Sequence, residues 1–197
     1  MFIVFEGIDG SGKSTQARIL ADTFESLGIP YVLTREPSDG IVGQKIRNLT
    51  TRLGPREEFR LFLEDRLDHV QRVVAPAIRD GKHVICDRYY YSSAAYQGAQ
   101  GMDPIEIIEE NRSRVPVPDI VFLIEVPIET ALNRITLSRS GRFSIFEKRK
   151  DLEAVARMYK TFKDPVIKRI DGEKPSAEVH LEIVGYLKKA GLKICKG

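Results

Sequence analysis

The sequence predicts an α/β fold, in which a parallel sheet of five strands carries helices on both of its faces. Short apolar runs alternate along the chain with longer segments of helical periodicity. Several of the runs are apolar at almost every position, as is typical of strands that are buried on both faces. Regular alternation of strand and helix favours a parallel sheet covered on both sides.

Five apolar runs have the length of a strand. They are Met1–Phe5, Tyr31–Thr34, His83–Asp87, Ile120–Val126 and Pro165–Ile170. Between them, apolar residues recur at helical spacing from Ala17 to Leu27, from Phe59 to Val74 and from Val179 to Leu187. Pro76 is expected to interrupt the second of these helices, and Ser176 is expected to cap the start of the third.

Composition limits the class of protein. The chain has 197 residues, 42% of them apolar, which predicts one domain with a substantial core. Its 31 basic and 28 acidic side chains are too balanced to predict a nucleic-acid or membrane-surface binder. No signal peptide is expected, and no apolar stretch approaches the roughly 20 residues of a membrane span. Cys86 and Cys195 have no metal-site spacing, so we expect a cytoplasmic protein with reduced thiols.

The strongest motif is G-I-D-G-S-G-K-S at residues 7–14, which fits the phosphate-loop pattern G-x-x-x-x-G-K-[ST] between a strand and a helix. Its glycines let backbone N–H groups point at phosphate oxygens, Lys13 adds a cation, and Ser14 offers a hydroxyl to Mg²⁺. The residues predicted to bind ATP are Gly7, Ile8, Asp9, Gly10, Ser11, Gly12, Lys13, Ser14 and Thr15. This motif alone covers GTPases, ATPases and kinases. The absence of N-K-x-D and the short chain favour a small kinase.

Charged residues follow two of the predicted strands, at the sheet edge where open α/β sheets bind their ligands. Arg35 follows the second strand, close to the phosphate loop, and is able to hold an acceptor phosphate; the alternative is a surface arginine in a turn. Asp87 and Arg88 end the third strand. Asp87 can hold Mg²⁺ through water or orient the attacking oxygen, and Arg88 can bind the acceptor phosphate. Their alternative is an ion pair that caps the next helix.

An aromatic cluster and a helical pair suit a nucleoside. Four of the seven tyrosines lie in residues 89–98, where they can pack against a sugar or base, or serve only as core. Phe62 and Arg66 are four residues apart and share one helix face. The ring can stack on a pyrimidine while the guanidinium donates to a carbonyl oxygen. Alternatively, Phe62 is core and Arg66 a surface charge that pairs with Asp65 or Glu64.

Together these motifs resemble the thymidylate kinase family of P-loop nucleoside monophosphate kinases over nearly the whole chain. The motifs stand in the family's order: F-E-G-I-D-G-S-G-K-S-T at 5–15, T-R-E-P at 34–37, Phe62 with Arg66, D-R-Y at 87–89 and A-Y-Q-G at 95–98. The resemblance implies a P-loop NTPase-type fold with a short lid. It also implies transfer of phosphate from Mg-ATP to dTMP, and a homodimer.

The resemblance also implies roles for single residues. Asp9 is expected near the 3′-hydroxyl and phosphate of dTMP, with Arg88 on that phosphate. The remaining expectations are Phe62 stacked on thymine, Arg66 at its O4, Tyr96 against the sugar, and Ser92 and Gln97 along the base pocket.

The lid is expected at about residues 138–150, a basic stretch. The phosphate loop has no basic residue at its variable positions. By resemblance to family members that supply arginines from the lid instead, Arg139, Arg142 or both are expected to close over the ATP phosphates. The alternative is a solvated basic loop. Two departures from the family pattern are Phe146, which offers no hydroxyl to the sugar, and Glu125 in place of aspartate.

Two rival functions share parts of this pattern. Another nucleoside or deoxynucleotide kinase would share the phosphate loop and the acid–arginine pair. A non-catalytic nucleotide-binding module, acting on nucleic acid, is favoured only by a basic cluster. That cluster comprises Arg139, Arg142, Lys148, Arg149 and Lys150.

Overall fold

The computed structural model describes residues 1–138 and 149–194, and their five strands form one parallel sheet in the order β2-β3-β1-β4-β5. The strands are β1 (Phe2–Glu6), β2 (Tyr31–Arg35), β3 (His83–Asp87), β4 (Ile120–Glu125) and β5 (Ile167–Asp171). The predicted sheet of five parallel strands is therefore confirmed.

The fifth strand begins later than predicted. Its expected start was Pro165, but β5 begins at Ile167. Pro165 has no N–H to donate to a neighbouring strand. The Asp164 carboxylate accepts the N–H of Val166 at 3.1 Å, which makes a turn of this segment. Pairing with β4 therefore starts only after the turn.

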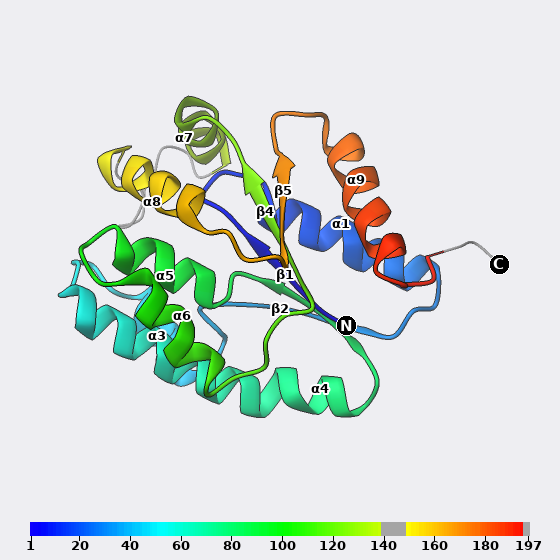
Figure 1. Cartoon of the computed structure of the whole chain (residues 1–197), viewed down its shortest axis with the longest axis horizontal. Coiled ribbons are helices and arrows are strands. Elements are labelled where there is room, and N and C mark those ends of the chain that lie inside the picture. The colour runs from blue at the N-terminus through cyan, green and yellow to red at the C-terminus, as the bar shows by residue number, and fades with distance from the viewer. Residues whose placement is uncertain (139–148, 195–197) are drawn as a thin grey trace.

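Helices cover both faces of the sheet (Figure 1). Their bounds are α1 (Lys13–Ser26), α2 (Ile41–Arg47), α3 (Pro55–His69), η1 (Val70–Val74), α4 (Ala75–Arg79), α5 (Tyr90–Gly98), α6 (Pro104–Arg112), α7 (Ile128–Ser138), α8 (Arg149–Thr161) and α9 (Ser176–Lys189). In Figure 1, α1 and α9 lie together on one side of the sheet, while α3, α4, α5, α6 and α8 lie on the other. Within the described ranges, no helix is long and apolar enough to span a bilayer.

Alternate residues of β1 enter two separate cores. Phe2 and Val4 pack into the core under α3, α5 and α8, whereas Ile3 and Phe5 pack into the core under α1 and α9. All four side chains are buried. A strand whose two faces are both covered has no polar position, which is the physical reason for the continuous apolar run in the sequence.

Two predictions concern the boundaries of helices. Pro76 was expected to interrupt its helix near the end, and the α-helical pattern is interrupted there, because a widened π turn at Val70–Val74 separates α3 from α4, which continues to Arg79. The wider turn accommodates the proline ring, which would otherwise collide with the carbonyl four residues earlier. Ser176 is the first helical residue of α9 rather than its cap, since its hydroxyl accepts a hydrogen bond from Gln16 Nε2 at 2.9 Å.

The predicted lid falls mainly outside the described residues. Of the expected segment 138–150, the structure describes only its ends, in α7 and α8. Arg139, Arg142 and Phe146 lie outside the described residues.

Candidate active site

The phosphate loop connects β1 to α1 across the carboxyl end of the sheet. Gly7 has φ +137°, and a Cβ there would lie 2.4 Å from the carbonyl oxygen of Ile124. Gly10 has φ +78°, and its Cβ would lie 2.3 Å from the carbonyl oxygen of Ala131. The loop therefore needs glycine at both positions for its backbone conformation and for its close contact with β4 and α7.

Lys13 begins α1 and points back into the loop. Its side chain is buried, and its Nζ donates to the carbonyl oxygen of Ile8 at 2.8 Å. Burial, helped by repulsion from Arg88, lowers the pKa of Lys13 to about 8, against the opposing attraction of Asp9 and Asp87. An anion bound in the loop would favour the charged ammonium.

Ser14 and Asp87 bring a hydroxyl and a carboxylate together next to the loop. The Ser14 hydroxyl on α1 donates to Asp87 Oδ2 at the end of β3. The other carboxylate oxygen, Asp87 Oδ1, is buried and has no hydrogen-bond partner. The Ser14 hydroxyl and the Asp87 carboxylate are oxygen donors, which is the kind of ligand that Mg²⁺ takes.

Arg88 has a strained backbone and reaches the phosphate loop. Its φ of +75° lies in the left-handed region, which is rare for a residue other than glycine. Its Nη2 lies 2.6 Å from Asp9 Oδ1, and Tyr96 donates its hydroxyl to Asp9 Oδ2 at 2.9 Å. Burial alone raises the pKa of Asp9, but the charges of Arg88 and Lys13 outweigh it and lower that pKa to about 2.

Glu6 is a site residue that sequence reasoning missed. Its buried carboxylate accepts the N–H groups of Tyr89 and Ser92 at 2.8 and 3.1 Å, and the hydroxyl of Tyr159 at 2.8 Å. It therefore caps the start of α5 and fixes the chain directly after Arg88. The one sign of this role in the sequence was a carboxylate at the end of an apolar strand. Burial raises the pKa of Glu6, and these hydrogen bonds oppose the rise.

Arg66 lies inside the protein between α3 and α5. Its side chain is only 1% exposed. Its Nε donates to Glu36 Oε2 at 2.8 Å, its Nη1 to Asn111 Oδ1 at 2.7 Å, and its Nη2 to Ser93 Oγ at 3.2 Å. This excludes the alternative that Arg66 is a surface charge. Glu36 belongs to the T-R-E-P motif, but no sequence pattern indicated that it pairs with Arg66.

Phe62 and Gln97 lie on the same two helices as Arg66. Phe62 is partly exposed on α3, one turn before Arg66. Gln97 on α5 is fully buried, and its Nε2 donates to Glu58 Oε2 at 3.3 Å. Its Oε1 is buried and has no hydrogen-bond partner. Phe62 and Arg66 therefore lie on α3, and Gln97 lies on α5, which packs against α3.

Comparison with known proteins identifies the family. The model of the family described as thymidylate kinase matches residues 5–183. The chain belongs to the thymidylate kinase family. This confirms the resemblance seen in the motifs and the prediction of a phosphotransferase, and it disfavours the non-catalytic module.

Curated relatives cover almost the whole kinase. A thymidylate kinase of Desulfotalea psychrophila is 43% identical over 190 residues, which span 95% of this chain and 94% of that protein. One of Brachyspira hyodysenteriae is 40% identical over 190 residues, spanning 95% and 93%. A probable thymidylate kinase of Pyrococcus horikoshii is 38% identical over 200 residues, spanning 95% of each.

Not every predicted residue of the kinase lies at the site centre. Arg35 was expected beside the phosphate loop, but β3 separates β2 from β1. The Arg35 guanidinium is exposed and pairs with Asp39 at 3.0 Å. Ser92 was expected along the base pocket, but its Oγ contacts Glu6 at 2.6 Å and Arg88 at 3.1 Å. Ser93, one residue later, is the serine beside Arg66.

Arg134 on α7 is a further contact of the phosphate loop that sequence reasoning missed. Its Nη1 donates to the carbonyl oxygen of Ser11 at 3.3 Å, and its Nη2 to that of Gly172 at 3.0 Å. It thereby joins the phosphate loop to the connection between β5 and α9. Nothing in its helical pattern distinguished it from other surface arginines.

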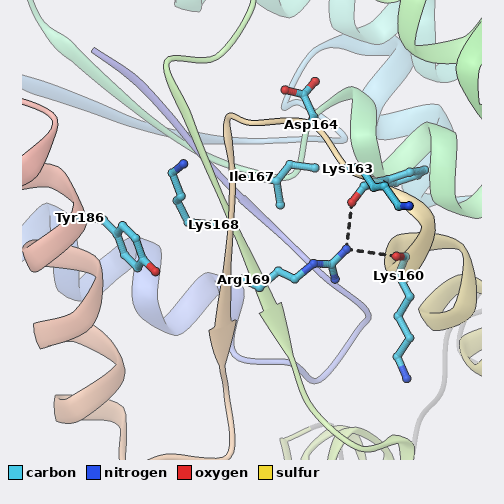
Figure 2. A pocket seen from close by; sticks show the side chains of 8 residues that line it. Lys160, Lys163, Asp164, Ile167, Lys168, Arg169 and Tyr186 are labelled. Carbon is cyan, nitrogen blue, oxygen red and sulfur yellow. Dashed lines mark hydrogen bonds between the residues drawn. The ribbon is translucent and has the colours of Figure 1, made fainter.

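A hollow lies away from the phosphate loop, between α8, β5 and α9 (Figure 2). Its lining includes Lys160, Lys163, Lys168, Arg169 and Tyr186. Arg169 donates to the carbonyl oxygens of Lys160 and Phe162 at 3.3 and 3.0 Å, which closes the end of α8. It also pairs with Glu125 at 2.7 Å. Glu125, which stands where the family pattern has aspartate, is therefore held by an arginine of β5.

Proposed function

We propose that this chain transfers the γ-phosphate of ATP to dTMP, giving dTDP and ADP. The observation that carries the proposal is the ion pair of Arg88 with Asp9 at 2.6 Å. Arg88 is expected to bind the acceptor phosphate, and Asp9 belongs to the loop that is expected to hold ATP. The ion pair therefore holds these two parts of the site together. The two phosphates would therefore meet beside Lys13, which is the arrangement that direct phosphoryl transfer requires.

On the donor side, residues 7–15 would hold the ATP phosphates with their N–H groups, and Lys13 would bind the outer oxygens. Ser14 would hold Mg²⁺ directly, and Asp87 would hold it through water. The unpartnered Asp87 Oδ1 supports this assignment. When bound, Mg²⁺ neutralises negative charge on the transferring phosphate.

On the acceptor side, Arg88 would bind the dTMP phosphate and orient one of its oxygens for attack on the γ-phosphorus. The bond from phosphorus to ADP then breaks, so no covalent enzyme intermediate is needed. Asp9 would accept from the 3′-hydroxyl, and Tyr96 would pack against the sugar where a 2′-hydroxyl would lie. For Arg35 to reach the acceptor phosphate, it would have to leave Asp39.

In the base pocket, thymine would stack on Phe62 with its O4 toward Arg66. Gln97 would meet the base edge, and its buried, unpartnered Oε1 supports this role. Ser92 would line the side of this pocket that faces the phosphate, and Ser93 would line it beside Arg66.

Further proposals concern the domain, the lid, the assembly and the location of the kinase, and of these the lid and the assembly rest on the family resemblance. One P-loop kinase domain would span residues 1–197, and a lid at about 138–150 would close over ATP through Arg139, Arg142 or both. Closure before transfer would limit hydrolysis of ATP. The kinase would work as a homodimer in the cytoplasm, without binding nucleic acid.

An ADP-release assay tests the proposal, with Mg-ATP and dTMP, dUMP, thymidine, CMP, AMP or no acceptor. We expect strong stimulation by dTMP, weaker stimulation by dUMP and little by the others. Arg88→Gln should raise the KM for dTMP and lower kcat, whereas Arg18→Gln, at an exposed position of α1, should change neither. Turnover on another acceptor but not on dTMP would overturn the base assignment.

A further inference from the structure

Two buried contacts join α3 to α5, two turns apart on α3 and one turn apart on α5. Arg66 on α3 lies 3.2 Å from Ser93 on α5, and Glu58 on α3 lies 3.3 Å from Gln97 on α5. Phe62 is one helical turn from both Arg66 and Glu58, so it lies at the level between the two contacts. A flat ring stacked on Phe62 would therefore have the Arg66 guanidinium near one end of its edge and the Gln97 amide near the other.

The Gln97 amide can in principle present either end to that ring. Its NH₂ group donates two hydrogen bonds and its oxygen accepts them, and the two groups have nearly the same shape. Because Gln97 is fully buried, water cannot decide which end faces the ring. The choice depends on the protein group at the other side of the amide, which is Glu58.

Glu58 is buried and held as a carboxylate. Arg52 donates to its two oxygens from Nε at 2.6 Å and from Nη2 at 2.7 Å, and the N–H of Leu53 adds a third bond at 3.1 Å. Burial alone raises the pKa of Glu58, but hydrogen bonds and charge from Arg52, Gln100 and Gln97 lower it below the ordinary value of 4.5. An ionised carboxylate has no proton to donate, so the NH₂ end of Gln97 must face it.

This orientation leaves Gln97 Oε1 as a buried acceptor without a partner. Buried polar atoms are rarely left unpaired, because the lost hydration is not replaced. Thymine and uracil carry an N3–H donor between two keto oxygens, whereas N3 of cytosine is an acceptor next to an amino group. The acceptor at Gln97 and the donor at Arg66 together match the first pattern and oppose the second.

We propose that Glu58 is a positioning residue that fixes the amide of Gln97 with its oxygen toward the base, and thereby selects thymine or uracil over cytosine. Glu58 itself touches no substrate. The proposal rests on the proposed function, since it assumes that the base of dTMP stacks on Phe62. It adds a specificity determinant that lies behind the residues in contact with the base.

The test is Glu58→Gln, measured as kcat/KM for dTMP and for dCMP. An amide at position 58 can donate or accept, so Gln97 is free to turn its NH₂ group toward the base. We expect the ratio of kcat/KM for dTMP to that for dCMP to fall about tenfold or more, because discrimination by hydrogen bonding of a base is large. The change should appear mainly in KM. The KM for ATP should stay within about twofold, since residue 58 would act only through the base pocket.

Two variants separate positioning from stability. Gln97→Met removes the amide, so the ratio should fall in this variant too, and Glu58→Gln should lower it no further in the Gln97→Met background. Asp164→Asn is the matched control. It also removes a carboxylate that pairs with an arginine, Arg112, but Asp164 lies outside the base pocket. It should lower the melting temperature and leave the ratio unchanged.

Each outcome decides the proposal. If Glu58→Gln does not fold, the double variant Arg52→Gln/Glu58→Gln avoids an unpaired charge and should show the same fall in ratio. An unchanged ratio in a folded variant, whatever its melting temperature, would mean that Glu58 is only structural and would overturn the inference. If the wild-type protein does not phosphorylate dTMP at all, the proposed function fails instead.

Discussion

The Arg66 guanidinium on α3 and the Glu36 carboxylate after β2 form a buried ion pair, with Nη2 and Oε2 2.7 Å apart. His69 contacts the other oxygen of Glu36 through Nδ1 at 3.1 Å, and its Nε2 lies 2.7 Å from the Thr34 hydroxyl. These contacts therefore hold the T-R-E-P segment against α3. It also fixes the direction of the guanidinium that is proposed to contact the base.

Replacing Glu36 should cost stability, because Glu36→Gln leaves the Arg66 charge buried without a counter-charge. We expect a loss of about 3–5 kcal/mol in the free energy of unfolding, measured by urea denaturation. The matched control is Asp68→Asn, which breaks an exposed pair with Arg72 on the same helical segment. It should cost less than about 1 kcal/mol. Equal losses in the two variants would contradict a structural role of the buried pair.

The contribution of Asp9 to stability should depend on pH. Its pKa is about 2 in the folded protein, against an ordinary value of 3.8. Because the folded state lowers this pKa, the stabilisation is complete above 3.8 and is lost as the pH falls through 2. At pH 7, Asp9→Asn should therefore cost about 2 kcal/mol of unfolding free energy.

That difference between Asp9→Asn and wild type should shrink as the pH is lowered from 4 to 2, when unfolding by urea is followed at each pH. A difference that stayed constant over this range would mean that Asp9 is not stabilised by its charge pair with Arg88.

Ser14 and Asp87 should set the Mg²⁺ requirement. Ser14→Ala or Asp87→Asn should raise the Mg²⁺ concentration for half-maximal velocity by about tenfold or more, because each removes an oxygen proposed to hold the ion. Chelation of Mg²⁺ should abolish transfer. Ser26→Ala, which removes a hydroxyl from the exposed end of α1, should leave the Mg²⁺ dependence unchanged. A wild-type Mg²⁺ dependence in both site variants would refute the assignment.

The lid arginines should act on the chemical step. At least one of Arg139→Ala and Arg142→Ala should lower kcat by about 100-fold or more, because each removes a proposed positive charge from the transferring phosphate. Arg149→Ala is the control, since Arg149 pairs with Glu129 at the surface. If neither lid variant changed kcat in single-turnover measurements, the two arginines would be no more than part of a solvated loop.

The sequence by itself determined the features that depend on neighbouring residues. Apolar runs indicated all five strands, most clearly the central strands β1, β3 and β4, because a strand covered on both faces is apolar at almost every position. The edge strand β5 contains Lys168 and Arg169, and its start was predicted two residues too early. The phosphate loop was recognisable because its glycines occupy backbone conformations closed to other residues, as at Gly7 and Gly10. The spacing of Phe62 and Arg66 placed them on one helix face, and the family motifs supplied the activity.

Only the tertiary structure decided which polar groups meet inside the protein. Arg66 pairs with Glu36, 30 residues away; Gln97 meets Glu58 at 39 residues; and Tyr159 reaches Glu6 at 153 residues. Periodicity indicates the face on which a side chain lies, but not the element that packs against that face. A buried charge is tolerated only where folding brings its partner. The groups that orient the site therefore became visible only when distant segments were placed together.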